Sequence, residues 1–562
     1  MKNISNYYLN KTRKRSISLI VMLISSLTFI SSCDDDVLNT KAADRFTEDA
    51  VWADKALIEA FIGNAYRTLP TGLRYSLYGL SVVTDENNAR SNAWAWSVWT
   101  GNLSADFLGE VDYWTGANSR NINYWQPINR VNLFFENIDR DREVEIDENT
   151  KNRMIGEMKV LRAYSYFKLI SLFGGVPLIT STFSLDDDFK VARNSYNECM
   201  DFVLSELDEA IALLPLEYDA LNQGRITKGA AMAVKSRALL YRASPLNNPE
   251  NDLQKWQDAA DAAKAVIDLN KYALYPDYKT MFLQESIYNS EMIWQRPYNQ
   301  FASPEAVYVE LSLYPNGYNG FGQVHPLHNL VEDYETVNGL LPKNDPTYDP
   351  QNPYVNRDPR FYATILYDGA PFQGRQVETF LPGGLDSNEG PVSAWNATQT
   401  GYYELKFANE KIVNPSGNNM SQTPWTYYRY AEILLNYAEA SYFLGDEATA
   451  REYINKVRSR PSVNMPPVTE SGVALFDRLV NERRIELVFE EHRWFDIRRW
   501  KILPQVEDED RTRMIIRKNP DGTKQYEVAF WKEGIFNEAN YLLPIPQSEI
   551  NKNALLQQNP GY

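Results

Sequence analysis

The sequence is short of histidine, cysteine and positive charge. Its 562 residues include three His and two Cys, too few for a Cys/His zinc cluster. The net charge is −17, with 74 acidic against 57 basic residues, whereas nucleic-acid binding needs a basic footprint. The composition therefore argues against nucleic acid as a partner. It leaves room for an all-oxygen calcium site, although the acidic triplet 186–188 lacks the spacing and the glycine of a calcium loop.

Long hydrophobic runs are missing too. The apolar segment 17–30 has 14 residues, whereas a membrane-spanning helix needs roughly 20. It follows a segment with five Lys and Arg residues and no acid, and it leads into Ser31-Ser32-Cys33. This order is typical of a secretory signal peptide. The small residues before Cys33 resemble the lipobox of bacterial lipoproteins, in which the Cys becomes the lipidated first residue.

We therefore interpret residues 1–32 as a lipoprotein signal peptide and 33–46 as a lipidated acidic linker, with palmitate among the acyl chains on Cys33. The triplet 34–36 (DDD) resembles the tag that exports lipoproteins of Bacteroidota to the outer face of the outer membrane. The mature chain is thus expected at the cell exterior, held to the outer membrane by its lipid alone. The competing interpretations are a solvated linker for the triplet and a secreted protein with an incidental cysteine for Cys33.

Hydrophobic periodicity indicates a mainly α fold. Thr47 is expected to open a helix, because two acids and apolar residues at three- and four-residue steps follow it. Helices with Ala, Gly and Ser on one side are typical of the antiparallel pairs in TPR-like arrays. Cys199 is expected on one helix as a small buried residue. The further helical stretches are 120–140, 149–173, 194–214, 227–244, 253–269, 425–445, 447–459 and 471–493.

Two stretches depart from this periodicity, and both are rich in aromatic and turn residues. One is 70–119, and the other is 285–425, where short strands are expected at 291–295, 360–366 and 402–407. Loop regions of this size within a compact protein are commonly functional. The predicted organisation is a helical TPR-like region at 47–284, a loop-rich insertion at 285–425, and C-terminal helices and a tail at 426–562 that complete the same domain.

Seven sequence blocks carry a family resemblance. They resemble, in the same order, the SusD/RagB outer-membrane lipoproteins of Bacteroidota. The blocks are 156–180 (GEMKVLRAYSYFKLISLFGGVPLIT), 224–246 (GRITKGAAMAVKSRALLYRASPL), 329–339 (NLVEDYETVNG), 357–366 (RDPRFYATIL), 428–440 (YRYAEILLNYAEA), 482–500 (ERRIELVFEEHRWFDIRRW) and 541–562 (YLLPIPQSEINKNALLQQNPGY).

The resemblance implies a SusD fold, with four TPR units and an irregular second part. It also implies a role in polysaccharide utilisation, in which the protein captures glycans as the lid of a SusC-like TonB-dependent transporter. The RagB branch is associated with peptides, so a peptide-binding lid is the alternative. A surface hydrolase is a further alternative, which would need two carboxylates converging in a cleft.

No catalytic motif supports an enzyme. The sequence contains no nucleophile elbow, phosphate loop, metalloprotease helix or dinucleotide fingerprint. Glu490-Glu491-His492 brings acid and imidazole together, but adjacent helix residues point in different directions. His325 and His328 have helical spacing without a third ligand, so the entry into a helix is the better interpretation. We expect a non-enzymatic protein without a cofactor.

Candidate ligand contacts lie in the aromatic loops, because sugar rings stack on flat aromatics while polar groups bind their hydroxyls. Segment 85–99 (DENNARSNAWAWSVW) supplies both kinds of side chain, and it corresponds to a loop that lines the site in glycan-binding relatives. An extended segment would place Trp94 and Trp96 on one face. The predicted contacts are Asp85, Arg90, Asn92, Trp94, Trp96, Trp99, Tyr318 and Trp395.

A structural role competes with each of these assignments. Trp is usually well buried, so any of the loop indoles is as readily a packing residue as a ligand contact. Four other tryptophans fall in helices, a strand or the family blocks, and they are expected in the core. These four are Trp125, Trp294, Trp494 and Trp500.

Overall fold

A computed structural model describes residues 48–73, 79–90, 93–118, 121–140, 145–298, 308–416 and 419–562, without the side chains of Ala93 and Trp94. The signal segment, Cys33 and the acidic linker lie outside these ranges. The chain divides into a small unit, up to Phe61 together with Arg140–Glu145, and a large unit that contains the remainder. None of the described helices has the length and apolar character needed to cross a membrane.

Within the small unit the expected first helix is divided in two. Helix α2 spans Glu48–Ala53, and α3 begins at Lys55 and ends at Arg67 in the large unit. The division occurs because the Asp54 carboxylate accepts hydrogen bonds from the Ala56 and Leu57 N–H groups, at 2.6 and 3.2 Å. Such a cap satisfies the free donors of a new helix.

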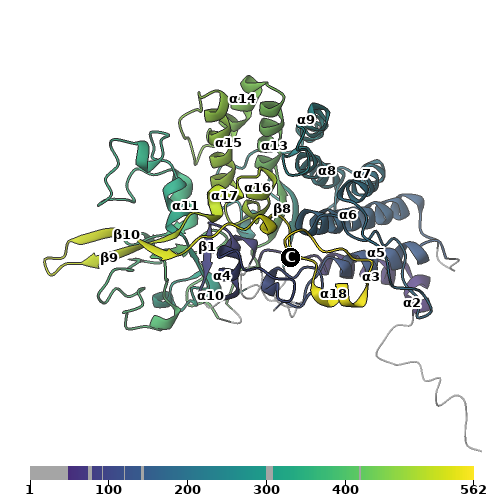
Figure 1. Ribbon diagram of the computed structural model, residues 1–562, viewed down its shortest axis with the longest axis horizontal. Helices are drawn as coiled ribbons and strands as arrows, with labels where there is room; N and C mark the ends of the chain where they lie inside the picture. The colour runs from purple at the N-terminus through teal and green to yellow at the C-terminus, as the bar shows by residue number, and fades with distance from the viewer. Residues whose placement is uncertain are drawn as a thin grey trace, which may run out of the picture. The chain divides into compact units, whose positions relative to one another are not determined.

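The large unit is built on a helical array, which confirms the mainly α prediction. Successive helices of this array lie side by side (Figure 1). Five of them begin at a side-chain cap, and α7 has a capping box in which Ser195 and Glu198 satisfy each other's backbone N–H groups. The array consists of α5 (Trp125–Asn137), α6 (Glu148–Phe173), α7 (Tyr196–Leu213), α8 (Lys228–Ala243), α9 (Leu253–Asp268), α13 (Tyr430–Phe443), α14 (Glu447–Arg458) and α15 (Gly472–Glu486).

Short elements make up the rest of the large unit. The strands pair as two-stranded antiparallel ladders: β1 (Asn87–Ala89) with β3 (Val324–Pro326), β2 (Met292–Arg296) with β8 (Trp425–Arg429), β4 (Ile365–Leu366) with β7 (Tyr403–Glu404), and β5 (Pro371–Phe372) with β6 (Arg375–Gln376). The short helices are α4 (Ala93–Trp99), α10 (Val309–Leu313), α11 (His328–Asp333), α12 (Pro359–Thr364), α16 (Arg493–Arg499), α17 (Leu503–Glu507) and α18 (Gln547–Lys552).

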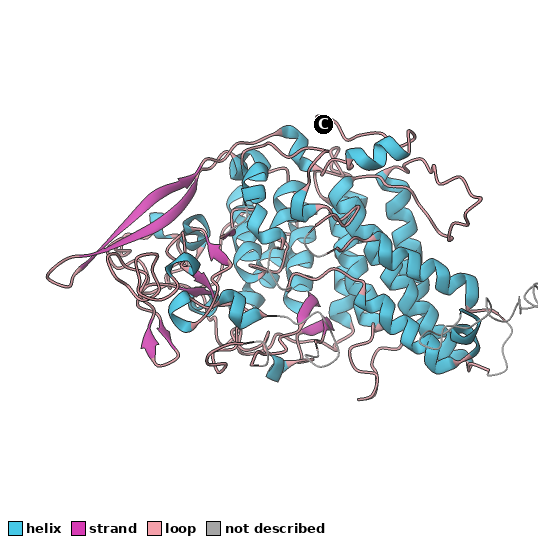
Figure 2. Ribbon diagram, turned by 90° about the horizontal axis from the view of Figure 1, so that it is seen from below, coloured by secondary structure: helices cyan, strands magenta, loops and turns pink. Residues whose placement is uncertain are grey.

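The longest strands form a hairpin that the sequence analysis missed. Strand β9 (Arg511–Lys518) pairs with β10 (Lys524–Lys532), and the hairpin extends beyond its neighbouring elements (Figure 2). The other edge of β9 is held by the insertion, because Met514 N–H donates to Thr400 O at 2.9 Å and Leu381 N–H to Ile516 O at 2.8 Å. The hairpin therefore rests on the loop-rich part, although it belongs to the C-terminal segment.

Two other predicted elements differ in type. Residues 425–429 were assigned to a helix but form β8, which pairs with β2. Residues 359–364 form α12 rather than a strand, because Pro359 occupies the first helical position and the Asp358 carboxylate accepts from Arg360 N–H at 2.8 Å. The strand predicted at 291–295 is confirmed as β2. Cys199 is buried on α7, as expected.

Ion pairs fill the centre of the large unit beside the array. Arg360 contacts Asp358, Glu482 and Glu486 at 2.8, 2.5 and 3.0 Å, and Arg429 binds Glu486 and Glu490, at 2.7 and 2.8 Å. All these side chains are buried. The charged residues of block 482–500 thus pair inside the protein, which gives Glu490 a structural partner in place of a catalytic one.

Candidate functional site

The tryptophan segment is helical rather than extended. Residues Ala93–Trp99 form α4. The extended backbone on which the predicted common face of Trp94 and Trp96 depended is therefore wrong. Trp99 is 1% exposed and packs in the core, while Trp96 is only partly buried. Asn92 and the Trp94 side chain lie outside the described residues.

Asp85 lies in the core rather than at a surface. It is 1% exposed, and its carboxylate accepts hydrogen bonds from Arg493 Nε and Nη2, at 2.9 and 2.8 Å. Burial alone raises the pKa of Asp85, but Arg484 and Arg493 outweigh it and hold the pKa well below its usual range. Its position corrects the predicted ligand contact, because the carboxylate is already bound and shielded from solvent.

Arg90 contacts the backbone of Trp395, which is another of the predicted ligand contacts. Arg90 Nη1 donates to the Trp395 carbonyl at 2.7 Å and also to Asn396 Oδ1, while the Arg90 N–H binds Gln323 O at 2.9 Å. The Trp395 side chain is 77% exposed. Arg90 thus fixes the backbone of the loop that presents this indole to solvent.

Tyr318 is a packing residue instead. Its side chain is 8% exposed, with the Arg375 guanidinium 3.8 Å from its ring centre and the Phe372 ring at 4.8 Å. Its hydroxyl donates to Phe372 O at 3.0 Å. These contacts correct the predicted ligand role, because they cover the ring on which a sugar would stack.

A cavity of about 250 Å³ lies between the hairpin and the insertion; we call it the hairpin cavity. Trp531 and Arg513 come from the hairpin, and Gln399 comes from the loop that carries Trp395. None of its lining residues is an acid. They are Thr379, Leu381, Ser387, Asn388, Thr398, Gln399, Gly401, Arg513, Met514, Ile515, Ile516 and Trp531.

Cation–π contacts join this cavity to Trp96. Lys532 Nζ lies 3.8 Å from the Trp96 ring centre and 5.3 Å from that of Trp531, and Arg513 lies 4.9 Å from the Trp531 ring. A row of alternating aromatic and cationic side chains therefore runs from α4 to β9. We call Trp96, Gln399, Arg513, Trp531 and Lys532 the hairpin site.

The hairpin half of this site was not predicted from the sequence. Arg513, Trp531 and Lys532 lie in the segment that was assigned to helices and a tail. The signal was present, because Asn519-Pro520-Asp521-Gly522 is a turn sequence between two runs rich in β-forming residues.

Buried polar groups support the site from below. Asn88 Nδ2 donates to Gln399 Oε1 at 2.9 Å, and Asn87 Nδ2 donates to Glu404 Oε2 at 2.8 Å. Burial raises the pKa of Glu404 to about 8, and burial next to Asp85 raises the pKa of Glu86 to about 8. Both carboxyls are therefore largely protonated at pH 7.

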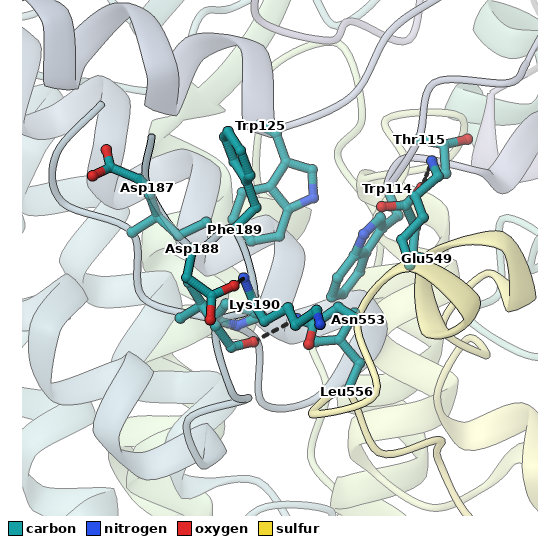
Figure 3. A pocket seen from close by; sticks show the side chains of 14 residues that line it. Trp114, Thr115, Trp125, Asp187, Asp188, Phe189, Lys190, Glu549, Asn553 and Leu556 are labelled. Atoms are coloured by element: carbon teal, nitrogen blue, oxygen red, sulfur yellow. Dashed lines mark hydrogen bonds and ion pairs between the residues drawn. The ribbon is translucent and has the colours of Figure 1, made fainter. Parts of the chain in front are cut away.

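A second cavity, of about 630 Å³, lies between α5, the loop 187–191 and the C-terminal segment. Figure 3 shows Trp114, Trp125 and Phe189 around it, with Asp187, Asp188 and Glu549 also in its lining. Trp125 thus faces a cavity rather than lying in the core as predicted. The core prediction is confirmed for Trp294, Trp494 and Trp500.

The hairpin site offers stacking surfaces and charges rather than acid–base chemistry. Its cavity contains no carboxylate pair, which glycoside hydrolysis requires. His492 is buried, and burial together with nearby arginines holds its pKa well below the usual value. Within the described ranges, no cluster of three His, Cys, Asp or Glu residues has the geometry for a metal ion.

Comparisons with known proteins agree with this architecture. A SusD-like protein from Bacteroides fragilis is 28% identical, with a TM-score of 0.76 over 92% of this chain and 99% of that one. A SusD-like carbohydrate-binding protein from the same species is 27% identical, with a TM-score of 0.76 over 90% and 100% of the chains. A SusD-like protein from Bacteroides ovatus is 21% identical over 96% of this chain and 97% of its own.

Family models cover both parts of the chain. The model of a family described as starch-binding and associating with the outer membrane matches residues 38–240. The SusD family model matches residues 282–562, half of the chain. The resemblance carried by the seven sequence blocks is confirmed: the chain belongs to the SusD/RagB family.

Proposed function

We propose that this chain is a non-catalytic glycan-binding lipoprotein, which captures an oligo- or polysaccharide at the hairpin site. One observation carries the proposal: the partly exposed indole of Trp531 lines a cavity that has polar groups and no acid in its lining. Lys532 joins Trp96 to Trp531, and the exposed Trp395 lies on the loop that supplies Gln399 to the lining. Sugars offer apolar ring faces and hydroxyl edges, which match such a surface. The name of the carbohydrate-binding relative from B. fragilis supports the same ligand class.

Delivery and anchoring form the second part of the proposal. The lipobox-like segment before Cys33 supports a lipid anchor, and the description of the matching family model supports the outer membrane. As the family resemblance implies, the partner is a SusC-like TonB-dependent transporter at the cell exterior. A replacement of Cys33 by Ala should abolish incorporation of labelled palmitate and release the protein from the membrane fraction.

Calorimetric titration of residues 34–562 against a panel of oligosaccharides tests the binding proposal. We expect Kd values of roughly micromolar to millimolar, as a few stacked rings provide. Trp531→Ala and Trp395→Ala should each weaken binding by about three- to tenfold. Phe530→Ala is the matched control, since Phe530 neighbours Trp531 and is 59% exposed but does not line the cavity.

Three outcomes would contradict the proposal. Binding of a peptide mixture without binding of any saccharide would favour a RagB-like peptide lid. Release of shorter products during the incubation, seen by chromatography, would favour a hydrolase. Equal losses for Phe530→Ala and Trp531→Ala, with unchanged melting temperatures, would move the binding site away from the hairpin cavity.

A further inference from the structure

The hairpin concentrates positive charge on an acidic protein. Residues 511–532 contain six Lys and Arg residues against two acids, whereas the whole chain carries a net charge of −17. The two acids, Asp521 and Glu527, are exposed. This local reversal of charge lies on the same element that supplies one wall of the hairpin cavity.

Most of these cations form no ion pair with a carboxylate in the part of the chain that the structure describes. Lys524 forms an ion pair with Asp368, and Arg511 is buried and donates to the Val506 carbonyl at 2.9 Å. For the other four, no carboxylate of the described residues lies within ion-pair distance. These four, the free cations, are Arg513, Arg517, Lys518 and Lys532.

Two of the free cations are held at the aromatic surface itself. Lys532 lies over Trp96 and beside Trp531, and Arg513 lies beside Trp531 and lines the cavity. The Arg513 Nε is buried without a hydrogen-bond partner among the described atoms. A ring stacked on Trp531 would therefore have a guanidinium and an ammonium group within reach of its substituents.

The surroundings favour a negative ligand as well. The other polar lining side chains, among them Ser387, Asn388 and Gln399, are neutral. The lining of the larger cavity is mixed in charge, because three acids, Asp187, Asp188 and Glu549, lie there with Lys190 and Lys552. The hairpin cavity, which is lined by Arg513 and no acid, is therefore the more favourable of the two for an anion.

We propose that the hairpin site takes an acidic saccharide, one that carries carboxylate or sulfate groups, with a ring stacked on Trp531 and the anionic groups paired with Arg513 and Lys532. The inference rests on the proposed glycan-binding function and names its ligand class. Arg517 and Lys518, toward the end of β9, extend the positive surface along the hairpin.

Titration with three kinds of oligosaccharide tests this inference: an alginate hexamer for carboxylates, a κ-carrageenan hexamer for sulfate esters, and maltohexaose as the neutral reference. We expect at least one acidic oligomer to bind about tenfold or more tightly than maltohexaose at 50 mM NaCl. Its affinity should fall at 500 mM NaCl, since salt screens exposed charges. Comparison of the alginate and κ-carrageenan titrations shows whether the site prefers carboxylate or sulfate groups.

Charge-removing variants locate the effect. Arg513→Gln and Lys532→Gln should each lower the affinity for the acidic oligomer by about three- to tenfold. This is the range for a partly exposed charge-assisted contact. Lys456→Gln is the matched control, because Lys456 also makes a cation–π contact, 3.7 Å from the Tyr453 ring, but lies on α14. It removes the same charge and should leave binding unchanged.

The outcomes separate this inference from the function on which it rests. If maltohexaose binds as tightly as both acidic oligomers and Trp531→Ala weakens it, glycan binding stands and the acidic ligand class is wrong. If no saccharide of the broader panel binds, the proposed function itself fails. Equal losses for Lys456→Gln and Lys532→Gln would show a general charge effect and overturn the assignment to the hairpin site.

Discussion

At the scale of the residue, burial favours the protonated form of two carboxyl groups, those of Glu404 and Glu86. Burial raises the pKa of Glu404 to about 8, so the folded state binds a proton that the unfolded chain releases near pH 4.5. The stability contributed by this proton is present below the unfolded pKa. It is lost progressively as the pH rises from about 4.5 toward 8.

A Glu404→Gln replacement should remove this pH dependence. The amide stays neutral at every pH, and its oxygen can still accept the Asn87 hydrogen bond. Between pH 5 and pH 8 the free energy of unfolding should therefore fall by roughly 2–4 kcal/mol less in the variant than in the wild type. Urea unfolding at both pH values measures the difference. Glu527→Gln on β10, where the side chain is exposed, is the control and should follow the wild type. Parallel curves for Glu404→Gln and the wild type would disprove the protonated state.

The buried arginines give a second prediction at this scale. An Arg360→Ala variant would leave three buried carboxylates, those of Asp358, Glu482 and Glu486, without their shared cation. We expect a loss of about 3–5 kcal/mol in the free energy of unfolding. Arg451→Ala, which breaks a partly exposed pair with Glu447 on α14, should cost under about 1 kcal/mol. Similar losses for both variants would contradict the central role of the buried network.

At the scale of the element, helices were predictable because their signals are local. The helix predicted at 194–214 is α7 at Tyr196–Leu213, whose cap residue and hydrophobic spacing lie within the segment itself. Strand β8 was assigned to a helix because it runs directly into α13, and its partner β2 lies more than a hundred residues earlier in the chain. Partners at that distance leave no periodic signal.

The capping box of α7 predicts a measurable difference between two serines. Ser195 Oγ accepts from the Glu198 N–H at 3.2 Å, whereas Ser471, at the same position before α15, makes no side-chain cap. Ser195→Ala should therefore cost about 1 kcal/mol in the free energy of unfolding, and Ser471→Ala close to nothing. Thermal unfolding followed by circular dichroism compares them. An equal effect of the two substitutions would assign the cost to the hydroxyl rather than to the cap.

At the scale of the whole molecule, long-range contacts decided which site predictions failed. Asp85 looked like a ligand contact because it stands in a polar loop, yet its partners are Arg484 and Arg493, some 400 residues later. Trp395 and Arg90 remain predicted ligand contacts, whereas Trp531 was not predicted, because only the folded hairpin brings it beside Gln399. The local sequence showed which side chains could bind a ligand. It did not show whether they are exposed, because burial depends on segments distant in the sequence.

The C-terminal tail is also held by hydrogen bonds to residues that are distant in the sequence. Leu543 N–H donates to Leu172 O at 2.7 Å, and Asn559 Nδ2 donates to the carbonyls of Phe173 and Leu543, at 2.9 and 2.7 Å. Arg193 Nη2 donates in turn to Asn559 Oδ1 at 3.0 Å. The last residues of the chain thus satisfy carbonyls at the end of α6, which belongs to the helical array.

We therefore expect the helical array of the large unit and the C-terminal segment to unfold together. Asn559→Ala removes the donor to the Leu543 carbonyl, whereas the Phe173 carbonyl keeps its hydrogen bond from Arg193 Nη2. The variant should cost about 1–3 kcal/mol and lower the midpoints seen by far-UV circular dichroism and by tryptophan fluorescence equally. Asn551→Ala is the matched control, because Asn551 is exposed and binds only Gln547 within α18. A second transition in Asn559→Ala, in which fluorescence changes before helix content, would mean that the tail folds separately from the array. Coincident transitions would instead make the tail part of the same cooperative unit, since the carbonyls that it satisfies belong to α6.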